Sequence, residues 1–391
     1  MASPVLTDHN VPHVSTIPAN KGETIKLFVR ERNGTPAGEP RRPVLMLHGR
    51  SVPGMVGFDL QYKQYGWAEK LAKAKFDVFI MELQGSGRST RPMMGDSRNV
   101  SPAQQGLLSP NPNAMPYTGS PLYTSQLNNS QSDWDEVETV VDFILTTTGA
   151  MELDLIGWSA ASQQLGPYTI KNPAKVRSLF LLAPIFPPKG RASAPGTDFD
   201  APVALPVSLP AAAFGFPMTV STKDSLEATW DKELHCPEQR EAGMVDVVWK
   251  AIMENDGVGV NWGGAQAGQP TGLSRVRNSY WWGWNSTTVP LHGRLGNDVP
   301  VCIVYGAHDS IVNTSPDLGL LYFSVPELYK AIPGPQKLMF RIACAGHQMP
   351  WEREAQLIHR MSEHWLKNGK IEGATTGSYD RDEDGALTPL D

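Results

Sequence analysis

The sequence predicts an α/β fold built on a doubly wound, mostly parallel sheet. Continuous apolar runs of strand length recur along the 391-residue chain, as expected of strands buried on both faces. Segments with helical spacing of apolar residues lie between many of these runs, and strands that alternate with helices form parallel sheets. Hydrophobic residues make up 40% of the chain, which is enough for a large core.

The individual elements follow from these patterns. Residues 24–30 alternate apolar and polar side chains, which predicts a half-exposed strand. The continuous apolar runs that predict core strands are at 44–49, 76–82, 153–159, 176–184, 299–306 and 337–343. The helical patterns are at 66–74, 133–145, 238–254 and 351–366. Ser132 is expected to cap the second of these helices.

Two long segments interrupt the alternation and divide the chain. Residues 91–131 are rich in Pro, Asn, Ser and Gly, which predicts a long loop that is either functional or mobile. Residues 186–298 are expected to be an insertion between two parts of one core, 1–185 and 299–368. Residues 369–391 are polar and acidic, which favours a poorly packed, solvated tail over a calcium-binding loop.

Charge and hydropathy exclude several classes of partner. The net charge of −6 disfavours nucleic acid and anionic membranes, which select for clustered Lys and Arg. No apolar run is long enough for a membrane span, and the first residues lack the pattern of a signal peptide. We therefore expect a cytoplasmic protein that acts on a small molecule and that can form a homo-oligomer.

The cysteines are sparse. Only Cys236, Cys302 and Cys344 occur, far apart and odd in number, which predicts neither a disulfide framework nor a zinc cluster. Cys302 and Cys344 lie in apolar surroundings and are expected to be buried thiols. This cysteine usage favours a reducing compartment.

A candidate nucleophile follows the apolar run at 153–156. Residues 157–161 read Gly-Trp-Ser-Ala-Ala and precede a plausible helix. A serine on a sharp strand-to-helix turn needs small residues two positions before and after it, here Gly157 and Ala161. Ser159 is therefore the predicted nucleophile, although a lone match of this kind is a weak signal.

The partners that a serine nucleophile needs occur further along the chain. A hydroxyl requires a base, and the base requires an orienting carboxylate. Asp309 follows the apolar run at 299–306, and His347 follows the run at 337–343. The order Ser159, Asp309, His347 places each residue at the carboxyl end of a strand, where open α/β sheets bind ligands. The competing His308 and Asp317 are interpreted as a loop residue and a helix-start residue.

The turn after the first core strand predicts an oxyanion hole. The backbone N–H groups of Arg50 and Ala160 are the expected donors, and Gly49 allows the backbone to approach. His48 is interpreted as structural. The Arg50 side chain is either a surface group or a contact to an anionic part of the substrate.

These motifs together resemble the α/β-hydrolase family, and within it the capped lipase/esterase-like serine hydrolases. The resemblance covers about 40–185 and 298–367, through LHGRSVPG (47–54), ELQGSGRS (82–89), GWSAAS (157–162), YGAHDSIV (305–312) and AGHQMPWE (345–352). It implies the α/β-hydrolase fold, a Ser-His-Asp acyl-enzyme mechanism without cofactor or metal, and a mainly helical cap formed by the insertion. A serine nucleophile counts against epoxide hydrolases and haloalkane dehalogenases.

The substrate is less well defined. The expected substrate-binding residues are Gly49, Ser51, Trp158, Trp281, Trp282 and Trp284. The four tryptophans in this set favour an ester or lactone of a mid-sized, largely apolar molecule that is cyclic or aromatic. A carbon–carbon bond hydrolase, a non-hydrolytic member of the family, and a ligand-binding receptor on a retained hydrolase fold remain as alternatives.

Overall fold

A ten-stranded sheet organises the protein. The structure, a computed structural model, describes residues 4–109, 111, 114–117, 119, 122–123, 126–191, 199, 217–315 and 322–390. The strand order is β1-β2-β4-β3-β6-β7-β13-β14-β15-β16. The strands from β4 to β15 run parallel, whereas β1, β2 and β16 pair antiparallel with their neighbours. The predicted doubly wound, mostly parallel sheet is confirmed.

Strands β3, β4, β6, β7, β13 and β14 follow the predicted apolar runs to within a few residues, and β2 follows the alternating segment at 24–30, whereas β1, β15 and β16 match none of the predicted strands. The strands of the sheet are β1 Val5–Val14, β2 Thr24–Asn33, β3 Pro43–Leu47, β4 Asp77–Glu82, β6 Leu153–Trp158, β7 Val176–Leu182, β13 Val301–Gly306, β14 Lys337–Ile342, β15 Gly377–Arg381 and β16 Leu387–Pro389. Every residue of β3, β4, β6 and β13 is buried, as expected of central strands covered on both faces.

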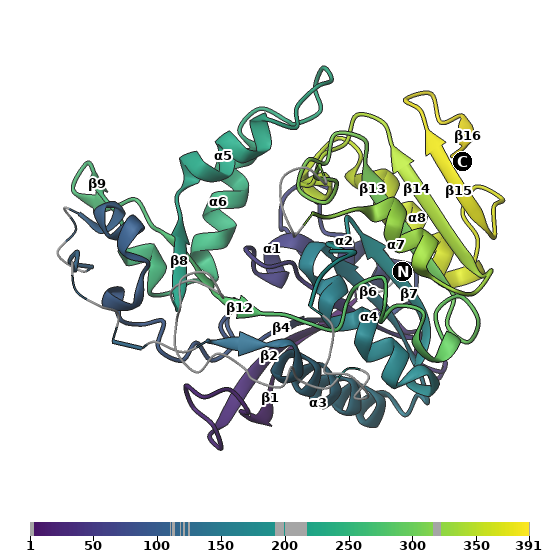
Figure 1. Cartoon of the computed structure of the whole chain (residues 1–391), viewed down its shortest axis with the longest axis horizontal. Coiled ribbons are helices and arrows are strands. Elements are labelled where there is room, and N and C mark those ends of the chain that lie inside the picture. The colour runs from purple at the N-terminus through teal and green to yellow at the C-terminus, as the bar shows by residue number, and fades with distance from the viewer. Residues whose placement is uncertain are drawn as a thin grey trace.

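Helices cover both faces of the sheet (Figure 1). The α-helices are α1 Gly54–Phe58, α2 Trp67–Lys73, α3 Ser130–Thr148, α4 Ser162–Lys171, α5 Lys223–Asp231, α6 Met244–Glu254, α7 Val325–Ala331 and α8 Ala355–Asn368. Helices α3 and α4 pack together, and α2 packs with α8. Helix α3 is capped by Asn129, which forms a capping box with Ser132, so the prediction of Ser132 as the N-cap is wrong by one turn.

In Figure 1 the insertion places its helices α5 and α6 to one side of the main sheet. Besides α5 and α6 it contains the antiparallel pair β8 (Met218–Ser221) and β11 (Ser274–Arg277). A second short pair joins β9 (Ala265–Gln266) to β10 (Gln269–Pro270), and β12 (Ser279–Tyr280) pairs with β5 (Asn128–Asn129). Strands therefore accompany the helices of this segment.

The long loop at 91–131 packs against the insertion through a small separate core. Its members come from both segments: Met94, Val100, Leu108, Ala114, Leu127, Met218, Val220, Trp262 and Leu273. The loop also contains two short 3-10 helices, Ser97–Asn99 and Pro102–Leu108. Burial of these apolar side chains ties the loop to the insertion.

Both ends of the chain extend the sheet. Strand β1 forms a hairpin with β2, and β15 pairs with β14, where Asp380 forms an ion pair with Arg341 at 2.8 Å. The expectation of a poorly packed tail after residue 368 is therefore wrong for 377–389. In the part of the chain that the structure describes, no helix has the length and hydropathy of a membrane span.

Candidate active site

Ser159 lies at a sharp turn between β6 and α4. Its φ of +59° falls in the left-handed region, which is strained for a non-glycine residue. The turn brings Gly157 against Ala161: a Cβ at Gly157 would lie 3.1 Å from the Ala161 Cβ and 2.9 Å from Leu165 Cδ1. Small residues at both positions are therefore a steric requirement of this turn.

Three strand ends bring a serine, a histidine and a carboxylate together. Ser159 Oγ lies 2.9 Å from His347 Nε2, and His347 Nδ1 lies 2.9 Å from Asp309 Oδ2. Asp309 Oδ1 accepts hydrogen bonds from the backbone N–H groups of Ile311 and Val312, which hold the carboxylate in place. The arrangement is the one that a serine nucleophile, its base and an orienting acid require.

The electrostatics of the site suit His347 as a base. Burial lowers its pKa, but the charge and hydrogen bond of Asp309, together with Glu233 and Glu352, raise the pKa above the usual value of 6.5. An imidazolium at this buried position would thus be stabilised by carboxylates that are already in place.

The turn after β3 lies against the serine. A Cβ at Gly49 would lie 3.0 Å from Ser159 Cβ and 3.4 Å from its Oγ, so only glycine lets this backbone approach. Among the described residues, the Arg50 N–H has no hydrogen-bond acceptor, which leaves it available to an oxyanion. His48 binds the Gly49 carbonyl oxygen and accepts from Leu83 N–H, and burial lowers its pKa to about 3, as expected of a structural histidine.

A buried carboxylate from the insertion contacts both catalytic loops. Glu233 follows α5 and is completely buried. Its Oε1 accepts from the N–H and Oγ–H of Ser310, at 2.9 Å each, and its Oε2 accepts from the His347 N–H at 2.6 Å. Burial and the charge of Asp309 raise the Glu233 pKa. One side chain therefore joins the insertion to the loops of the acid and the base.

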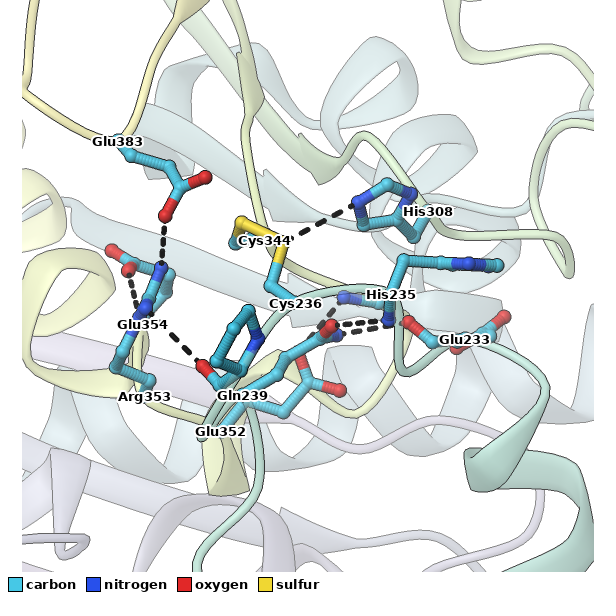
Figure 2. The surroundings of a disulfide bond; sticks show 12 residues. Glu233, His235, Cys236, Gln239, His308, Cys344, Glu352, Arg353, Glu354 and Glu383 are labelled. Atoms are coloured by element: carbon cyan, nitrogen blue, oxygen red, sulfur yellow. Dashed lines mark hydrogen bonds and ion pairs between the residues drawn. A yellow bond between two sulfur atoms is a disulfide. The ribbon is translucent and has the colours of Figure 1, made fainter.

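A disulfide strengthens the same junction, as Figure 2 shows. Cys236 in the insertion is bonded to Cys344, three residues before His347. The prediction that the cysteines form no disulfide, with Cys344 a buried thiol, is therefore wrong; Cys302 is a free, buried thiol as predicted. His308 Nε2 lies 3.8 Å from Cys236 Sγ, and its ring contacts that of His235.

Glu352 and Gln239 complete the junction in Figure 2. Glu352 accepts from the Gly346 N–H, from Trp230 Nε1–H and from the Gln239 side-chain amide. Burial raises the Glu352 pKa to about 7. The loop that carries His347 is thus held by two buried carboxylates and a covalent bond.

Ser159 and His347 face a cavity of about 890 Å³. Its wall includes all the expected substrate-binding residues, Gly49, Ser51, Trp158, Trp281, Trp282 and Trp284, together with Arg50. Gln104 and Leu107 of the long loop also line it. Trp282 and Trp284 are almost fully buried, and Trp284 packs on Gly166, where a Cβ would meet its ring at 2.2 Å. These two side chains therefore hold the structure as well as form the wall.

Comparison with known proteins identifies the family. The model of the family described as "alpha/beta hydrolase fold" matches residues 42–354, most of the chain. The chain belongs to this family. No curated protein matches it at a significant level.

Solved structures of other α/β-hydrolases are similar to this chain at low identity. One is a serine hydrolase from the polyaromatic-hydrocarbon-degrading bacterium Cycloclasticus zankles, with 14% identity, a TM-score of 0.48 and coverage of 94% of this chain and 100% of that one. Another is a thermophilic esterase from Thermogutta terrifontis, with 15% identity, a TM-score of 0.49 and coverage of 92% of this chain and 98% of the esterase. A third is the 2-hydroxy-6-oxo-6-phenylhexa-2,4-dienoate hydrolase of Rhodococcus sp. strain RHA1, with 14% identity, a TM-score of 0.44 and coverage of 92% and 99%. Such distant likeness carries no information about the substrate.

Sequence reasoning missed Glu233, Gln239 and the Cys236–Cys344 bond. Glu233, Cys236 and Gln239 lie in a polar stretch between two helices, without any local motif, and Cys344 lies 108 residues beyond Cys236 along the chain. The rival acid Asp317 lies outside the described residues. The carboxylate that contacts His347 Nδ1 in the structure is that of Asp309.

Proposed function

We propose that this α/β-hydrolase is a serine hydrolase that cleaves an ester or lactone through an acyl-enzyme. The continuous hydrogen-bonded relay from Ser159 through His347 to Asp309, at the wall of a cavity, carries the proposal. His347 takes the Ser159 proton as Oγ attacks the carbonyl carbon, and Asp309 stabilises the imidazolium. The N–H groups of Arg50 and Ala160 stabilise the oxyanion. His347 then protonates the leaving alcohol and activates the water that releases the acid.

The cavity supports a mid-sized, largely apolar substrate. A volume of about 890 Å³ falls in the range of sites that bury most of a drug-sized ligand. Trp158, Trp281 and Trp351 supply aromatic surface on its wall. We propose that residues 186–298 act as the cap over this site and that cyclic or aromatic esters and lactones fit it.

The test is hydrolysis of a panel of aryl esters, lactones, amides and vinylogous diketones by the wild-type protein and by Ser159→Ala. We expect a burst of the first product from an aryl ester, and a loss of turnover of about 10⁴-fold or more in the variant. Turnover of a diketone alone would identify a carbon–carbon hydrolase. Binding without any turnover would identify a receptor, and either result would overturn the esterase proposal.

The cellular compartment and the oligomeric state are predicted independently of the activity. The disulfide removes the cysteine-based argument for a reducing setting, because such bonds persist mainly in oxidising compartments. The predicted cytoplasmic location is tested by fractionation together with thiol labelling of Cys236 and Cys344. The predicted homo-oligomer is tested by light scattering.

A further inference from the structure

A group of arginines lies beside the oxyanion turn. Arg50, Arg91, Arg275 and Arg277 surround a recess that adjoins the main cavity. Three of them have carboxylate partners. Arg91 and Arg275 bind Asp256, at 3.1 Å and 2.9 Å, and Arg277 lies 3.5 Å from an Asp133 oxygen and binds the Gln84 carbonyl.

Arg50 differs from the other three. Within the described residues its side chain makes one hydrogen bond, from Nη2 to the Asn278 amide oxygen at 3.2 Å, and has no carboxylate partner. A guanidinium has five N–H donors, so four of them remain for a ligand. The side chain is exposed, and it is exposed into the cavity, whose wall it forms.

The surroundings leave the charge of Arg50 poorly compensated. Burial by the cavity walls and the nearby charge of Arg277 lower the Arg50 pKa, although the side chain itself stays open to the cavity. The described residues that line the cavity include Arg50 and Arg191 but no Asp or Glu. Their charge is therefore opposite in sign to the protein's net charge of −6. A cation in a partly desolvated cleft favours an anionic ligand.

We propose that Arg50 binds a carboxylate of the substrate, so that the preferred substrates are esters that carry a second, free carboxylate. This inference rests on the proposed hydrolase function and narrows its substrate class. The planar fork of the guanidinium matches a carboxylate with two parallel hydrogen bonds. Arg50 follows Gly49, which lies against Ser159, so the Arg50 side chain begins beside the nucleophile and lines the same cavity. The tryptophans and aliphatic side chains of the wall contact the rest of the substrate.

The first experiment compares substrates that differ in charge. p-Nitrophenyl monoesters of adipic and suberic acid carry the anion on the acyl side, and p-nitrophenyl hexanoate and octanoate are their neutral partners. On the alcohol side, 4-carboxyphenyl hexanoate is compared with 4-acetylphenyl hexanoate. The readout is the ratio of kcat/KM for the charged ester to that for its neutral partner, with Ser159→Ala as the background.

We expect the ratio to favour the charged ester on one side and to fall about 10- to 100-fold in Arg50→Gln, the loss typical of a charged hydrogen-bonded pair. Arg50→Lys should recover part of the preference for the charged ester. The matched control is Arg294→Gln, since Arg294 pairs with Asp298 and does not line the cavity. The control ratio should equal that of the wild type. An Arg50→Gln ratio equal to that of the wild type, on both sides, would overturn the proposal.

The second experiment measures binding without turnover, so that failure of the carboxylate site and failure of the esterase proposal can be told apart. Calorimetry with monoethyl adipate is carried out on Ser159→Ala and on Ser159→Ala/Arg50→Gln. If monoethyl adipate binds the double variant about 10- to 100-fold more weakly than it binds Ser159→Ala, the carboxylate site is supported even if no ester is cleaved. Equal binding to both variants refutes it even if neutral esters are cleaved well.

Discussion

Glu233→Gln tests whether the insertion takes part in catalysis through the loops of Asp309 and His347. The carboxylate accepts two backbone N–H groups, one on each oxygen. A glutamine keeps one carbonyl oxygen, so in either orientation one of these two backbone N–H groups faces an NH₂ group, and the His347 N–H is the buried one. An unsatisfied buried donor costs about 1–3 kcal/mol. If the unsatisfied N–H on the His347 loop raises the free energy of the transition state by this amount, kcat/KM falls about 5- to 150-fold.

The pH profile distinguishes this role from a merely structural one. The negative charge of Glu233 raises the His347 pKa, and the base must be neutral to accept the serine proton. Removing the charge lowers that pKa, so the acid limb of kcat/KM moves to lower pH. The assay is hydrolysis of p-nitrophenyl hexanoate by purified variants between pH 4.5 and 9.

Asp154→Asn is the matched control. Asp154 is a buried carboxylate in the first half of β6, far from the strand end that carries Ser159, and it binds Ser178 and Arg177. Its loss should lower the melting temperature and leave the acid limb in place. If Glu233→Gln lowers kcat/KM but the acid limb of its pH profile coincides with the acid limbs of the wild type and of Asp154→Asn, the reasoning about Glu233 is refuted.

Three further outcomes are expected. Asp309→Asn should lower kcat about 10⁴-fold, because the amide favours the wrong imidazole tautomer; near-normal turnover would mean that another carboxylate orients His347. Cys236→Ser with Cys344→Ser should restore loop entropy to the unfolded chain and so remove about 5 kcal/mol of stability, for a separation of 108 residues. At an unfolding entropy of about 0.8 kcal/mol/K this lowers the melting temperature by about 6 °C in scanning calorimetry, and an unchanged melting temperature would argue against the bond. Trp281→Ala should reduce kcat/KM more for a naphthyl ester than for p-nitrophenyl acetate, since the small ester does not reach this wall; equal losses would assign Trp281 a structural role only.

The strands and the relay could be predicted because both depend on local patterns. A strand buried on both faces must be apolar throughout, so β3, β4, β6 and β13 stand out in the sequence. Parallel strands end at one edge of the sheet, so residues that follow β6, β13 and β14 had to lie near one another. Strand β1 at one edge of the sheet and strand β15 next to the other edge are partly exposed and polar, and for this reason their sequences resemble loops.

The amino-acid sequence by itself determined the fold class, the turn at Ser159 and the chain order of serine, acid and base. Only the tertiary structure decided which distant groups meet there. Cys236 and Cys344 are 108 residues apart, and Glu233 lies 114 residues from His347. No periodicity or spacing records such contacts, because they arise from how the insertion packs on the sheet edge. In the same way, only the packed chain reveals that Asp256 and Asp133 pair with other arginines and that Arg50 has no carboxylate partner among the described residues.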